Sequence, residues 1–148
     1  MMADNGGSVQ PWHVLLVANR TSSTPSLIDE VRRRARSRPH RFTLMIPDAE
    51  DQESGGRTLA SALPLLERAA GMDVAGIVRG PDPVTAIREA AATGDYDEIL
   101  ISTRSRRTSK WLRRDLPHRV RDIAVPIAVL TPEGDSIGSF IPSGRRAG

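Results

Sequence analysis

The chain has 148 residues, of which 39% are hydrophobic, 26% are charged and only 3% are aromatic. This length suits one domain with an aliphatic core. The lack of cysteine excludes a disulfide framework, a zinc site with thiolate ligands and a cysteine nucleophile. The histidines His13, His40 and His118 do not have the spacing of metal ligands, so we predict no metal site and expect His13 and His40 on the surface.

The net charge is +3, and almost all basic residues are arginines, with Lys110 the one lysine. Arginine suits phosphate, but 18 acidic residues balance these cations, so we interpret most of them as solvated. Stacking aromatics and a recognised motif are missing, which disfavours a nucleic-acid partner. No apolar run approaches the ~18 residues of a membrane span, and the first residues lack the apolar region of a signal peptide. We therefore expect a cytoplasmic protein without membrane contact.

Apolar runs alternate with segments of helical periodicity along the chain. The runs that suit buried strands are residues 13–19, 41–48, 74–80, 97–102 and 125–130. Thr24 with Pro25, and Asp82 with Pro83, are typical of helix starts, and Gly71 is typical of a helix end. This alternation predicts an α/β fold, with a parallel sheet covered by helices on both faces.

Two features of the second helical segment are irregular. The polar residues 49–56 suggest a mobile loop in which Gly55 and Gly56 form a hinge. Pro64 lies inside the apolar pattern that follows, and a proline within a helix costs about 3 kcal/mol or more. We therefore expect a kink or a split start in this helix.

The loop after residues 97–102 is rich in hydroxyl groups and arginine. It contains Arg104, Ser105, Arg106, Arg107, Thr108 and Ser109. A strand that leads into such a loop and then into a helix is a common anion site in α/β proteins. Trp111 follows as a structural anchor that packs this segment on the sheet, or alternatively as part of a ligand lid or partner surface. Asp115 is predicted to cap the helix that ends near Ile123.

Together these elements resemble the universal stress protein family over residues 12–131. The resemblance rests on the five-strand alternation, on the Gly-Pro-Asp-Pro turn at residues 80–83, and on the strand DEILIST leading through a loop and helix to VPIAVL. It implies a Rossmann-like, three-layer sandwich of the adenine-nucleotide α-hydrolase type, with a five-stranded parallel sheet in the order 3-2-1-4-5. We expect this domain at residues 12–132, between a flexible leader (1–11) and a flexible tail (133–148).

Nucleotide-binding members of the family carry three spaced glycines after the fourth strand, the last followed by Ser or Thr. The matching positions in this chain are Ser102, Ser105, Asp115 and Leu116, and none is glycine. The acidic residue that usually ends the first strand is replaced by Asn19. We therefore predict a universal-stress-protein-like regulatory domain of the stress response in which nucleotide binding is lost or altered.

Two alternatives remain open. In one, the protein is a sensor in which Asn19, Ser102 and the loop 104–109 form a side-chain site for a small anionic ligand such as ATP, AMP or cyclic AMP. In the other, it is a ligand-free interaction module that forms a homodimer through the fifth strand and the tail, as the resemblance implies. An enzyme is disfavoured because the sequence places no general base or metal ligand, and no catalytic residue is predicted.

Overall fold

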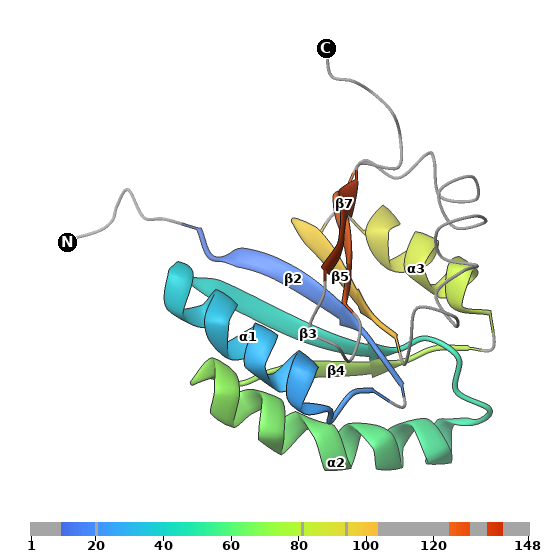
Figure 1. Cartoon of the computed structure of the whole chain (residues 1–148). Helices are drawn as coiled ribbons and strands as arrows, with labels where there is room; N and C mark the ends of the chain where they lie inside the picture. Colours follow the sequence, from blue (N-terminus) through green and yellow to red (C-terminus); the bar gives the residue numbers. More distant parts are fainter. Residues whose placement is uncertain are drawn as a thin grey trace.

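The computed structural model describes residues 10–19, 21–80, 82–93, 95–103, 125–130 and, for the backbone alone, 136–140. Six strands form one sheet in the order β4-β3-β2-β5-β6-β7 (Figure 1). They are β2 (Trp12–Val17), β3 (His40–Ile46), β4 (Ala75–Val78), β5 (Glu98–Ser102), β6 (Ile127–Leu130) and β7 (Ser136–Phe140). The five strands β2 to β6 pair with one another in parallel, which confirms the predicted order 3-2-1-4-5.

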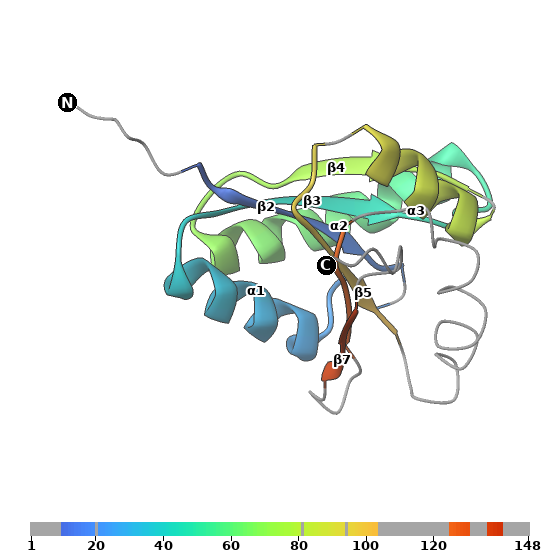
Figure 2. The ribbon, with the colours of Figure 1, turned by 90° about the horizontal axis from the view of Figure 1, so that it is seen from above.

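Helices cover both faces of the sheet (Figure 2). Those among the described residues are α1 (Pro25–Ser37), α2 (Gln52–Ala70) and α3 (Pro83–Ala92). Successive side chains of a strand point to opposite faces. Val14 and Leu16 of β2 accordingly join the core beneath α1 and α2, whereas Leu15 and Val17 join the core beneath α3. The central strand is thus buried on both faces, as its continuous apolar run predicts.

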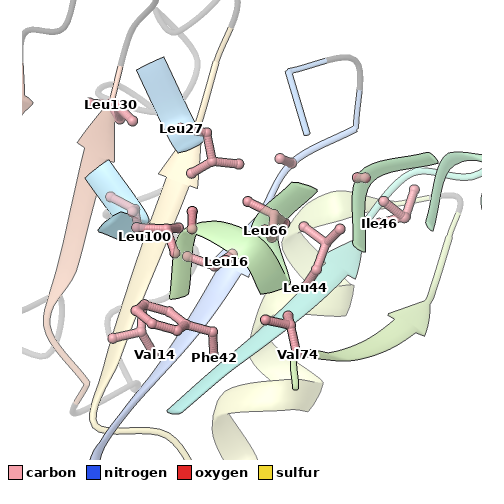
Figure 3. Close-up of a cluster of buried hydrophobic side chains, with 14 of the residues drawn as sticks. Val14, Leu16, Leu27, Phe42, Leu44, Ile46, Leu66, Val74, Leu100 and Leu130 are labelled. Carbon is pink, nitrogen blue, oxygen red and sulfur yellow. The ribbon is translucent and has the colours of Figure 1, made fainter. Parts of the chain in front are cut away.

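The core beneath α1 and α2 is built from aliphatic side chains of both helices and several strands. Leu27 of α1 and Leu66 of α2 belong to the same cluster as Leu16 and Leu44 of the sheet (Figure 3). Each of these four side chains is fully buried, and burying a leucine contributes about 1.5–3 kcal/mol. This cluster fixes the helices against the sheet and so positions the loops at the strand ends.

The predicted helix ends are present. Thr24 caps α1 by accepting a hydrogen bond from the backbone N–H of Leu27, and Asp82 caps α3 by accepting one from Val84. Gly71 ends α2 with φ +74°, and its N–H donates to the carbonyl of Glu67. Only glycine adopts this left-handed conformation without steric cost.

The start of α2 corrects the prediction of a mobile loop at residues 49–56. The helix begins at Gln52, because the Asp51 carboxylate accepts a hydrogen bond from the N–H of Ser54 at 2.7 Å. Gly55 and Gly56 are therefore helical rather than a hinge. The helix also continues through Pro64 without a split start, since its buried stripe extends on both sides of the proline.

The C-terminal region contains a strand that the sequence analysis does not predict. β7 lies within the range assigned to the tail and pairs antiparallel with β6. Its short Ser/Gly-rich sequence carries little local strand signal. Hydrogen bonding to the edge of β6 provides the stabilisation that the local sequence does not.

The amino end of the sheet is tied to α1 by a charged network that the arginine pattern alone does not reveal. Arg34 of α1 forms ion pairs with Glu30 at 2.7 Å and with Glu98 of β5 at 2.8 Å. The same Glu98 oxygen accepts a hydrogen bond from the indole of Trp12 at 2.9 Å. The Arg34 and Glu98 side chains are each only 14% exposed. Arg34 is thus a structural cation rather than a solvated one.

The expectation that His13 and His40 lie on the surface is wrong, since both are buried. His13 contacts the carbonyl of Asp95 through Nδ1 at 2.8 Å and the hydroxyl of Thr43 through Nε2 at 2.9 Å. Its ring also lies against Tyr96. Burial lowers the pKa of His13, because the charged imidazolium loses solvation there.

Candidate functional site

The candidate site lies where the first and fourth predicted strands, β2 and β5, end side by side. The two strands are parallel and in register, with Val17 opposite Ile101. From β2 the sheet extends to β3 and β4 on one side and to β5, β6 and β7 on the other. In open α/β sheets, ligands bind beyond the carboxyl ends of strands at such a change of direction. Asn19 and Ser102 both lie at this edge.

The turn between β2 and α1 is fixed by its own hydrogen bonds. The carbonyl of Asn19 accepts from the N–H of Ser22 at 3.1 Å and from its hydroxyl at 2.7 Å. The hydroxyl of Thr21 donates to the carbonyl of Ser102 at 3.1 Å and so links this turn to the end of β5. Thr21 and Ser22 are buried. These hydrogen bonds hold the edge in a defined conformation.

The side chain of Asn19 points to the neighbouring strand β3. Its Nδ2 donates a hydrogen bond to Oδ1 of Asp48 at 2.8 Å. Asp48 follows the end of β3 and is exposed. The Asp48 carboxylate thus lies beside the end of β2, although Asn19, just after β2, carries an amide.

An open hollow of about 410 Å³ adjoins Asn19 between the start of α1 and the first half of α2. Its lining is dominated by hydroxyl groups, with Arg57 as the cation, and comprises Asn19, Ser22, Ser23, Ser54, Arg57, Thr58 and Ser61. Arg57 pairs with Glu53 at 3.1 Å, and both side chains are well exposed. The hollow offers hydrogen-bond donors and acceptors, and its lining is more polar than apolar, which suits a polar ligand better than an apolar one.

The structure brings together two of the predicted site residues, Asn19 and Ser102. The other predicted residues lie outside the described ones: Arg104, Ser105, Arg106, Arg107, Thr108, Ser109, Trp111 and Asp115. Their assignment to an anion site, to an anchor and to a cap stays a prediction. Within the described part of the chain, no three His, Cys, Asp or Glu side chains form a group that could hold a metal ion. None of the helices in that part is long and apolar enough to cross a membrane.

Sequence reasoning missed Asp48 and Thr21. A signal for Asp48 existed, because it directly follows a buried strand, and parallel strands end at the same edge of a sheet. Thr21 offered no signal, since its hydroxyl contacts a backbone carbonyl 81 positions further along the chain.

Comparison with known proteins identifies the same architecture in solved structures. A universal stress protein from Archaeoglobus fulgidus matches with a TM-score of 0.56 at 18% identity, covering 80% of this chain and 92% of that one. The structure of the universal stress protein from Archaeoglobus fulgidus in complex with dAMP matches with a TM-score of 0.55 at 18% identity, covering 82% and 98%. No family model and no curated protein matches the sequence. The chain therefore shares the fold of universal stress proteins.

Proposed function

We propose that this protein is a universal-stress-protein-like regulatory domain whose nucleotide site is altered, with its acidic group supplied by β3 instead of β2. The hydrogen bond of 2.8 Å between Asn19 and Asp48 carries this proposal. It places a carboxylate beside the end of β2, where the family resemblance implies an acidic residue near base and ribose. A carboxylate accepts several hydrogen bonds, so the bond to Asn19 leaves acceptor capacity for a sugar hydroxyl.

The charge of Asp48 also favours one orientation of the ligand. Two like charges ~4 Å apart repel by about 4 kcal/mol at an effective dielectric constant of ~20. A phosphate would therefore lie away from Asp48 and toward the end of β5, where Ser102 leads into the arginine-rich loop 104–109. This arrangement suits an adenine nucleotide such as AMP or cyclic AMP, whose phosphate would extend from the Asp48 side toward the end of β5. The complex of the Archaeoglobus fulgidus protein with dAMP supports the same ligand class.

Calorimetric titration with AMP, dAMP, cyclic AMP, ADP and ATP tests the proposal. We expect the wild-type protein to bind AMP, and the comparison with ADP and ATP shows whether further phosphates add affinity. Asp48→Asn should weaken AMP binding about tenfold or more, because a hydrogen bond to a charged group contributes about 1.5–3 kcal/mol. Glu50→Gln is the matched control, since it removes an exposed acid two positions away and should leave affinity unchanged.

Two outcomes would contradict the proposal. Absence of binding for all five nucleotides rejects the site, provided that thermal unfolding shows no nucleotide-dependent shift either. Binding that is equal in wild type and Asp48→Asn rejects the role of Asp48 but keeps a nucleotide site. A comparison of AMP with dAMP shows in addition whether the 2′-hydroxyl of the ribose is recognised.

A further inference from the structure

β6 would be the edge strand of the parallel sheet if the chain ended after it. Its residues, Ile127–Leu130, are all aliphatic, and none is more than 4% exposed. A free edge presents a row of unpaired N–H and C=O groups. An edge strand without a charge or a proline is a template for pairing with another chain. If its outer edge were unpaired, β6 could therefore pair with a strand of another chain.

β7 provides this cover from the same chain (Figure 1). It pairs antiparallel with β6, from Ile127 opposite Phe140 to Leu130 opposite Ser136, with a register shift between Val129 and Leu130. β7 is short and has Gly138 at its centre. Short length and irregular pairing both discourage the addition of a further strand. The outer edge of β7 is thus less prone to add a further strand than the edge of β6 would be.

The pairing of β7 also shows which kind of partner the edge of β6 accepts. All other strand pairs in the described sheet are parallel, but β6 takes up an antiparallel strand. A two-fold axis at this edge would place β6 of a second copy antiparallel to β6 of the first. β7 and a second copy would therefore compete for the same backbone groups.

We propose that β7 is an intramolecular cap that keeps the chain monomeric by occupying the edge through which two copies would otherwise join, β6 to β6. The cap replaces the predicted homodimer through the fifth strand and tail with a monomer that dimerises only when β7 is released. This proposal does not depend on nucleotide binding, and its test uses no ligand.

Light scattering after size-exclusion chromatography tests the cap on three variants. Deletion of residues 133–148 removes β7, and deletion of residues 142–148 is the matched control that keeps it. Gly138→Pro in the full chain disrupts the pairing without shortening the protein, because proline lacks the N–H and is excluded from paired strand interiors. We expect the mass of one chain for the wild type and the control, and the mass of two chains for the other variants. Dimerisation requires that both copies release β7. If each copy releases it ~10% of the time, removal of β7 strengthens dimerisation about 100-fold.

Hydrogen exchange at Ile127–Leu130 identifies the interface. Pro126 and Leu130 bond to β5 through their carbonyls, so the amides of Ile127 and Val129 face the opposite edge. These two amides should stay protected in the dimeric variants and lose protection on dilution to monomers. Folded variants that keep the mass of one chain at every concentration overturn the proposal. A wild-type dimer that the deletion of residues 133–148 converts to monomers also overturns it, because β7 would then join the copies. If that deletion variant misfolds, Gly138→Pro decides by the same criteria.

Discussion

The packing of Gly55 against β4 gives a sharp test of how α2 sits on the sheet. A Cβ atom at residue 55 would lie 2.5 Å from Cγ1 of Val78 and 3.0 Å from Cβ of Ala49. Val78 is β-branched and therefore stiff at χ1. Overpacking of this kind costs about 1–3 kcal/mol, whereas replacing a helical glycine by alanine gains about 1 kcal/mol. Gly55→Ala should thus lower the free energy of unfolding by up to about 2 kcal/mol.

The neighbouring glycine is the matched control. A Cβ atom at Gly56 would meet nothing within 4 Å. Gly56→Ala should therefore realise the helix-propensity gain of about 0.5–1 kcal/mol without a packing cost. Two identical substitutions at adjacent positions of one helix are then expected to have opposite signs.

Urea unfolding followed by far-ultraviolet circular dichroism measures both effects. The double variant Gly55→Ala with Val78→Ala should recover part of the loss from Gly55→Ala, measured relative to Val78→Ala alone, because the two side chains no longer collide. Equal stabilisation by Gly55→Ala and Gly56→Ala would refute the reasoning. That result would fit the mobile loop suggested by the sequence and not the packed helix of the structure.

Three further predictions concern stability. Glu98→Ala should lower the free energy of unfolding by about 3 kcal/mol, because it leaves the mostly buried Arg34 without its partner on β5. Glu53→Ala breaks an exposed pair and should lower it by less than about 1 kcal/mol in the same urea titration. Burial lowers the pKa of His13, so the contribution of the neutral imidazole to folding stability is complete above the unfolded-state pKa of ~6.5 and is lost as the pH falls below it. His13→Gln should therefore reduce the loss of stability between neutral and mildly acidic pH. An unchanged pH profile would exclude His13 as the source of that loss. Gly71→Ala should lower the thermal midpoint through a cost of about 1 kcal/mol, because φ is +74° at this helix end.

The order of the parallel strands could be predicted because its signals are local. Apolar runs such as residues 13–19 mark buried strands, and Pro25 and Pro83 mark helix starts independently of the rest of the chain. The start of α2 was missed for a different reason. Gly55 normally indicates a loop, but here glycine is required by the close approach of Val78 from β4. A tertiary contact thus overrides a local preference, and only the structure shows it.

The candidate site illustrates the same limit in its chemistry. A comparison of aligned positions registers the replacement of an acid by Asn19 as a loss of charge. In the sheet, residues from adjacent strands share one edge, so the missing carboxylate can be supplied by Asp48 from β3, 29 positions along the chain. The amide of Asn19 then has a structural role, because it donates a hydrogen bond to Asp48. An aspartate at position 19 would instead repel the Asp48 carboxylate. Asn19→Asp should therefore fail to restore a typical site and should weaken AMP binding, as measured by calorimetry. Only the double variant Asn19→Asp with Asp48→Asn, which exchanges the two groups, should recover it. Recovery by Asn19→Asp alone would show that Asp48 has no part in the site.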